Sequence, residues 1–205
     1  MNSTSPSSLA EFFDALITDA RDWCNGRMWF VRIPLWLYLA YVGWNQFNSP
    51  VYYCSLFGGI NLGIHEGGHL LFRFAGEFIC VAGGTLAQLA APIITLWIFF
   101  KQRDYFGIAV ALGWLSTNLI NVGVYMADAQ DMVLPLVTVG GGSENQVVGH
   151  DWRYLFTKLG VLGSDKAIGF LTRATGSGIM LLALVFGAWL MWEMAISDGK
   201  RQMEI

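Results

Sequence analysis

Two histidines and a glutamate stand in a stretch that otherwise contains glycine and large apolar residues, NLGIHEGGHLLF, residues 61–72. The spacing H-E-x-x-H places His65 and His69 one turn apart on the same face of a helix. Neutral imidazole nitrogens bind Zn²⁺, and the intervening Glu66 is placed to act as a general base toward water. Unpaired ionisable groups are costly inside an apolar segment, so we interpret the three residues as a zinc site rather than as hydrogen-bonding residues of a helix bundle.

A zinc site needs at least one further ligand. The candidates follow the apolar run that ends near residue 127, in the polar, glycine-rich segment 128–166. Asp128 ends a helix that can pack against the histidine helix, and the third histidine of the chain stands in this segment. We rank the candidates in the order Asp128, His150, and then Asp131 and Asp151.

Two asparagines precede Asp128 by one to three helical turns. In a protease, the amide of Asn118 or Asn121 could donate a hydrogen bond to a developing oxyanion. The alternative is that these amides only hydrogen-bond between neighbouring helices.

The composition is that of a membrane protein. The chain has 205 residues, of which 55% are hydrophobic and 13% charged, and its mean hydropathy is +0.48. Soluble domains carry about 25% charged residues. Each of five apolar runs has about the 20 residues needed to cross a bilayer. We therefore expect an all-α fold, a polytopic helical bundle with about five transmembrane helices, at 28–47, 52–73, 78–100, 105–127 and 168–194.

The N-terminal segment differs from the rest. Apolar residues recur at helical spacing between positions 9 and 23, and Ser8 followed by Glu11 is typical of a helix start. We predict an amphipathic N-terminal helix within 1–27 and a single membrane domain at 28–205. The helix could lie on the bilayer surface, pack on the protein's own loops, or contact a partner subunit.

Alternating crossings would gather most basic residues on the N-terminal face. That face would hold Arg21, Arg27, Arg32, Arg73, Arg153, Lys158, Lys166 and Arg173. The opposite face would hold Lys101, Arg103, Lys200 and Arg201. Basic residues prefer the cytoplasmic side, so we expect a cytoplasmic N-terminus in a bacterial inner (plasma) membrane. The same topology would place the zinc site on the N-terminal face.

The region 60–131 resembles the site-2 protease family of intramembrane zinc metalloproteases. HEGGH, 65–69, lies in an apolar run as in that family. AGGTLAQLAAP, 82–92, is similar to the family's G-P-x-x-N stretch, with Gln88 in the asparagine place. NVGVYMAD, 121–128, is similar to the family's asparagine some eight residues before a ligand aspartate. The resemblance is to short, divergent members, with a metalloprotease-like core at about 52–131; Ala129 stands where the family has glycine.

The resemblance implies that Zn²⁺ is held by His65, His69 and Asp128 and that Glu66 is the general base. The implied substrate is a transmembrane helix that unwinds locally. The alternative is a catalytically silent or metal-binding subunit of a larger membrane protein complex, and a transporter is disfavoured because no inverted repeat is present.

Other partners are excluded by charge and motif. A formal net charge of −3 argues against nucleic-acid binding. The glycine-rich loop 137–152, which could be a gate or a simple polar connection, lacks the lysine of a phosphate-binding loop, so we expect no nucleotide.

Overall fold

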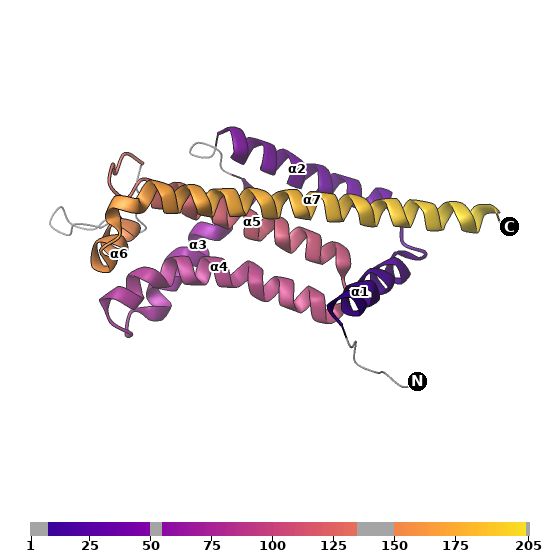
Figure 1. The fold of residues 1–205 in the computed structure, drawn as a ribbon, viewed down its shortest axis with the longest axis horizontal. Coiled ribbons are helices and arrows are strands. Elements are labelled where there is room, and N and C mark those ends of the chain that lie inside the picture. Colours follow the sequence, from indigo (N-terminus) through magenta and orange to yellow (C-terminus); the bar gives the residue numbers. More distant parts are fainter. Residues whose placement is uncertain (1–7, 50–54, 135–149, 204–205) are drawn as a thin grey trace.

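The computed structural model describes residues 8–49, 55–134 and 150–203, so most of the loop 137–152 lies outside the described residues. No strand occurs in these ranges, and the all-α prediction is confirmed (Figure 1). The elements in chain order are α1 Leu9–Cys24, η1 Phe30–Arg32, α2 Ile33–Asn48, α3 Leu56–Phe72, α4 Glu77–Gln102, α5 Tyr105–Ala127, α6 Asp151–Leu159, η2 Leu162–Ser164 and α7 Asp165–Met203.

Three helical segments of the described chain are long and apolar enough to cross a membrane: α4, α5 and Leu162–Gly199, which contains most of α7. They support the membrane assignment. The other two apolar runs fold as α2 and α3, of 16 and 17 residues. At 1.5 Å per residue these helices are about 24 and 26 Å long, shorter than a hydrocarbon core of about 30 Å. Five spans are therefore not confirmed.

Helix α5 is the central helix of the bundle. In the most apolar 18-residue stretch of α5, 56% of the residues are buried, whereas the corresponding share is 28% in α4 and in the α7 segment. Small residues allow α7 to approach closely: a Cβ on Gly169 would lie 2.5 Å from the Gly123 carbonyl oxygen. Ser116 donates a hydrogen bond of 2.7 Å to the Gly176 carbonyl. Close backbone approach at small residues is the usual way that helices associate in membranes.

Helix α2 runs in the same direction as α5. In the middle of α2, the Leu39 side chain lies against Gly113 of α5. Near its end, Gln46 donates to the Thr117 carbonyl at 3.4 Å. Both helices therefore advance together along the bundle.

Helix α3 also runs in the direction of α5. Its first turn stacks Phe57 on Trp114, with ring centroids 6.2 Å apart. Two turns later His65 contacts Gln88, which in turn donates to Asn121 of α5. The runs expected as two opposite crossings are therefore two shorter helices that advance toward the same end of the bundle.

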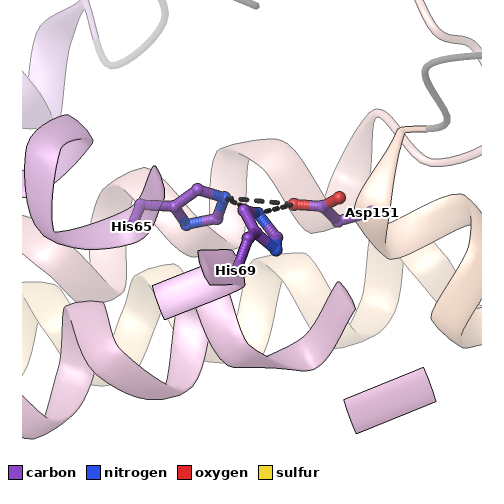
Figure 2. Close-up of side chains that lie close together, drawn as sticks. All are labelled: His65, His69 and Asp151. Carbon is purple, nitrogen blue, oxygen red and sulfur yellow. Dashed lines mark hydrogen bonds and ion pairs between the residues drawn. The ribbon is translucent and has the colours of Figure 1, made fainter. Parts of the chain in front are cut away.

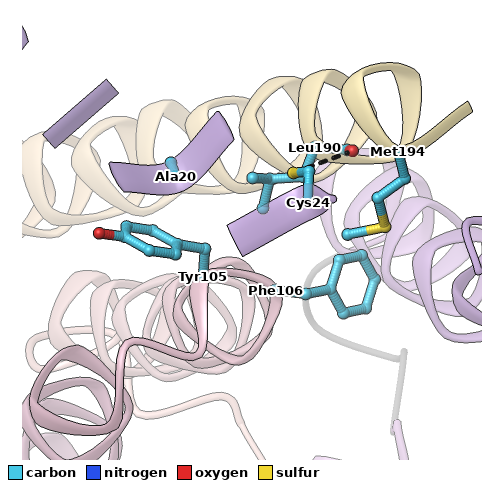
Figure 3. Close-up of a cluster of buried hydrophobic side chains, with 6 residues drawn as sticks. All are labelled: Ala20, Cys24, Tyr105, Phe106, Leu190 and Met194. Atoms are coloured by element: carbon cyan, nitrogen blue, oxygen red, sulfur yellow. Dashed lines mark hydrogen bonds between the residues drawn. The ribbon is translucent and has the colours of Figure 1, made fainter. Parts of the chain in front are cut away.

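Helix α1 packs on the protein's own helices α5 and α7, whereas the sequence analysis considered the bilayer surface, the protein's loops and a partner subunit. As expected, Ser8 accepts a hydrogen bond from the Glu11 N–H at the start of the helix. Figure 3 shows the apolar cluster that fixes α1 against α5 and α7. It consists of Ala20, Cys24, Tyr105, Phe106, Leu190 and Met194.

Two ion pairs give the position of α1 along the bundle. Arg21 lies 3.2 Å from Glu193 in the C-terminal half of α7, and Asp19 lies 2.7 Å from Arg103 at the α4–α5 turn. The end of α3, the start of α4, and α6 lie at the other end (Figure 1). The expectation that the histidine pair shares a face with the N-terminal helix is wrong. The reason is that α2 and α3 do not form two opposite crossings of the bundle. Both helices run toward the end of the bundle where α4 starts.

Candidate metal centre

The histidine helix α3 and helix α4 meet at glycines. A Cβ added to Gly68 would collide with the Gly83 carbonyl oxygen, and one added to Gly83 would lie 2.9 Å from the Gly68 carbonyl oxygen. The two backbones are thus in direct contact, which explains a helix-weakening glycine at position 68. Gly67 has nothing within 4 Å of its Cβ position, so packing gives no reason for the second glycine.

Three side chains converge beside this contact, as Figure 2 shows. His65 and His69 extend from α3, and Asp151 is the first residue of α6. The Asp151 Oδ2 atom lies 3.1 Å from His65 Nε2 and 3.3 Å from His69 Nε2. The two Nε2 atoms lie 3.0 Å from each other.

The remaining ring nitrogens determine how both imidazoles are protonated. His65 Nδ1 lies 3.0 Å from Gln88 Oε1, and His69 Nδ1 lies 2.9 Å from the Cys80 carbonyl oxygen. Both partners are oxygen acceptors, so each Nδ1 carries a proton. Each Nε2 atom therefore faces the other Nε2 and the carboxylate, with a lone pair when its ring is neutral and as a donor to Asp151 when its ring is protonated. A hydrogen bond from the distant ring nitrogen to a carbonyl or amide oxygen is the usual outer contact of a metal-binding histidine.

The donor set fits zinc. At Zn–N distances of 2.0–2.1 Å, tetrahedral ligand atoms are about 3.3 Å apart, close to the three separations seen here. Gly84 supplies the space on the α4 side. A Cβ at this position would lie 2.5 Å from His69 Nε2 and 2.7 Å from His65 Nε2. Any larger residue would push against the two nitrogens that a metal needs.

The site is partly buried. The exposed fractions of the side chains are 13% for His65, 23% for His69 and 16% for Asp151. Burial acts to raise the pKa of the Asp151 carboxyl, but its hydrogen bonds with His65 and His69 outweigh burial and hold that pKa below the ordinary value. Asp151 is therefore an anionic carboxylate at neutral pH, the form that binds a metal ion.

Glu66 and Asn121, the two residues expected to be catalytic, lie next to this cluster. Glu66 follows His65 on α3 and is partly buried. Asn121 is joined to the cluster through Gln88, whose amide donates to Asn121 Oδ1 at 3.3 Å while its oxygen accepts from His65. Asn118 is directed elsewhere, because its amide donates to the Trp114 carbonyl of its own helix.

Asp128, ranked first as the third ligand, lies outside the cluster. It caps the end of α5, and its carboxylate accepts hydrogen bonds from the Val133 and Leu134 N–H groups at 2.9 and 3.1 Å. The side chain is 6% exposed. Its oxygens thus satisfy the backbone of the turn after α5 instead of facing the histidines.

His150, ranked second, is adjacent to the cluster but is not part of it. Its Nδ1 accepts from the Arg153 N–H and so caps α6, while its ring stacks on Tyr125 with centroids 4.1 Å apart. Burial lowers the pKa of His150, against the opposing effect of Asp128, so the ring is neutral. Its Nε2 is 3.4 Å from Asp128 Oδ2, a long electrostatic contact. These contacts hold the start of α6, and therefore the next residue, Asp151.

The last-ranked candidates have different positions. Asp131 forms an exposed ion pair with Lys166 at 3.0 Å, whereas Asp151 completes the cluster. A sequence signal for Asp151 does exist, since acids are favoured in the first turn of a helix and His150 provides an N-cap. That signal indicates a helix start but does not indicate what the helix start faces.

Comparisons with known proteins add no match. No protein-family model matches the chain, and neither a curated protein sequence nor a solved structure matches it. The geometry of the His65, His69 and Asp151 cluster is therefore the basis for assigning a function.

Proposed function

We propose that this chain is an intramembrane zinc metallopeptidase of the site-2 protease type. One observation carries the proposal. Two histidine nitrogens and a carboxylate oxygen converge within 3.3 Å, next to Glu66, in a bundle with long apolar helices. The spacing and donor types are those of a zinc peptidase with three protein ligands.

In this proposal His65, His69 and Asp151 hold the ion, and Asp151 takes the role that the resemblance gave to Asp128. Bound zinc would supply Lewis-acid polarisation of the scissile carbonyl and of water. Glu66 takes a proton from the attacking water and delivers it to the leaving amine. Gln88 orients His65, and Asn121 fixes the Gln88 amide.

The substrate in this proposal is a transmembrane helix that unwinds locally at the site. Support comes from the position of the histidines on α3, against the long apolar helix α4, which a substrate would reach through the bilayer. A peptide bond in a helix is hydrogen-bonded to its own backbone, so local unwinding must precede cleavage.

The direct test compares wild-type protein with Glu66→Gln. Both purified chains would be incubated with membranes from cells that lack this protein, and new peptide termini would be identified by mass spectrometry. We expect termini from wild-type protein only, with zinc content equal in both. The same termini from Glu66→Gln would exclude Glu66 as general base, and no termini from either would remove the peptidase proposal.

A second function, a catalytically silent subunit of a larger membrane complex, is favoured by one observation. A proton can take the place of a metal ion in the cluster, because a protonated, charged His69 would form an ion pair with Asp151 at 3.3 Å. It would then only join α3 to α6. Purified protein without zinc, recovered with another membrane protein at fixed stoichiometry, would select this function.

We further propose a bacterial inner membrane location with a cytoplasmic N-terminus. Arg21, Arg27 and Arg32 all precede the first apolar helix, α2. Basic residues before the first membrane helix usually keep that flank in the cytoplasm.

A further inference from the structure

The candidate metal centre lies far from the α1 end along the bundle axis. The histidine cluster contacts α4 at Gly84, and α1 contacts the end of α4 at Arg103. These positions are 19 residues apart, which corresponds to about 28 Å along a helix, nearly the thickness of a hydrocarbon core. The two features thus belong to opposite membrane faces.

Both ends of the described chain lie on the α1 side. Arg21 of α1 pairs with Glu193, and α7 continues from there to Met203. At the other end, Gln130 donates to Asp165 at the start of α7 at 2.7 Å. The chain therefore leaves the α1 end through α2 and α3, returns through α4, and repeats the path through α5 and α7.

This arrangement regroups the basic residues. The α1 end holds Arg21, Arg27, Arg32, Lys101, Arg103, Lys200 and Arg201. The metal-centre end holds Arg73, Arg153, Lys158, Lys166 and Arg173. The majority thus stays with the α1 end, now without the metal centre, and three of its members precede the first apolar helix. Both features mark that end as cytoplasmic.

We infer that the metal centre opens on the extracytoplasmic face of the membrane. Zinc, water and the scissile segment then reach His65, His69 and Asp151 from that face. The substrate class is accordingly a membrane-inserted polypeptide, cut near the outer end of its transmembrane helix. The inference about the substrate class rests on the proposed peptidase function. The inference about the membrane face on which the site opens does not.

The test is labelling of single cysteines with a membrane-impermeant maleimide. In the full-length chain, Cys24, Cys54 and Cys80 are first changed to serine. Reporter cysteines are then placed at exposed positions, Ser164→Cys in η2 at the metal-centre end and Gln102→Cys and Asn25→Cys at the α1 end. Each variant is labelled in intact bacterial spheroplasts and again after lysis.

We expect labelling of Ser164→Cys in intact spheroplasts to be at least about tenfold stronger than that of Gln102→Cys or Asn25→Cys, with all three equal after lysis, because a charged reagent does not cross the bilayer. Labelling of Ser164→Cys only after lysis would place the metal centre in the cytoplasm and overturn the inference. If one of Gln102→Cys and Asn25→Cys were labelled in intact spheroplasts and the other only after lysis, these two positions would not lie on the same membrane face, which would contradict the arrangement inferred here.

A chelator separates this inference from the proposed function. An impermeant chelator added to intact spheroplasts should remove zinc from wild-type protein, as measured by elemental mass spectrometry after purification. Retention of zinc there, with loss after lysis, would contradict the outward-facing site. If purified protein holds no zinc at all, the peptidase proposal fails while the labelling result still decides the topology.

Discussion

The Nε2 atoms of His65 and His69 lie 3.0 Å apart, and both Nδ1 atoms donate to fixed acceptors. When both rings are neutral, two lone pairs face each other, with the Asp151 carboxylate beside them. Groups of this kind repel one another unless a cation lies between them. A proton or a metal ion can fill that role, so metal content is the measurement that separates the two functions considered above.

Replacing Asp151 should weaken zinc binding far more than replacing Asp128. Asp151→Ala removes a ligand atom, and we expect a loss of affinity of more than about 100-fold. Asp128→Asn removes a charge that contacts the turn after α5 and should change affinity by less than about tenfold. Competition with a zinc-binding dye in detergent measures both. The opposite order would identify Asp128 as the ligand, as the resemblance implies.

Gly84→Ala should abolish zinc binding without unfolding the bundle. Its methyl group would lie 2.5 Å from His69 Nε2, in the space between the two imidazoles. Gly67→Ala is the matched control, because its methyl group meets nothing within 4 Å and should stabilise α3 by about 1 kcal/mol. Zinc content and thermal unfolding would be measured for both. Full zinc binding by Gly84→Ala would show that the imidazoles do not meet there.

Removing the hydrogen bond that orients His65 should weaken zinc binding moderately. Gln88→Leu keeps the size of the side chain but loses the acceptor for His65 Nδ1, and such outer contacts contribute about 10–100-fold in metal affinity. Thr95→Val on the same helix is the control, since its hydroxyl donates only to the Ala91 carbonyl. Equal affinities for the two variants would mean that Gln88 does not orient the ring.

His150→Ala should act on the metal through the position of Asp151. The variant loses the cap of α6 and the stacking on Tyr125, so the start of α6 becomes less fixed and zinc affinity falls by about tenfold or more. The absorption spectrum of bound Co²⁺ should keep its shape, because no ligand is lost. A changed spectrum would instead make His150 a ligand. Thr157→Ala, at an exposed position of α6, controls for general loss of stability.

Features that depend on neighbours in the sequence could be predicted without the structure. The H-E-x-x-H spacing places His65 and His69 side by side because helix geometry is local, and Ser8 caps α1 for the same reason. The apolar composition was enough to indicate a helical membrane protein, because apolar runs of about 20 residues match the thickness of a bilayer. Length and hydropathy do not report direction, however, so two short helices with the same direction could not be distinguished from two opposite crossings.

The third member of the cluster and the end of the bundle at which the cluster lies were decided by tertiary contacts. Asp128 and Asp151 are both carboxylates near helix ends, and composition does not distinguish them. Asp128 bends back onto the N–H groups of the turn that follows it, whereas the contacts of His150 direct Asp151 toward the histidines. The ion pairs of α1 with α7 and the α4–α5 turn determine the end opposite the cluster. The Asp128 contacts are local, but the position of Asp151 beside the histidines and the ion pairs of α1 join residues distant in the sequence, whose proximity only the packed bundle creates.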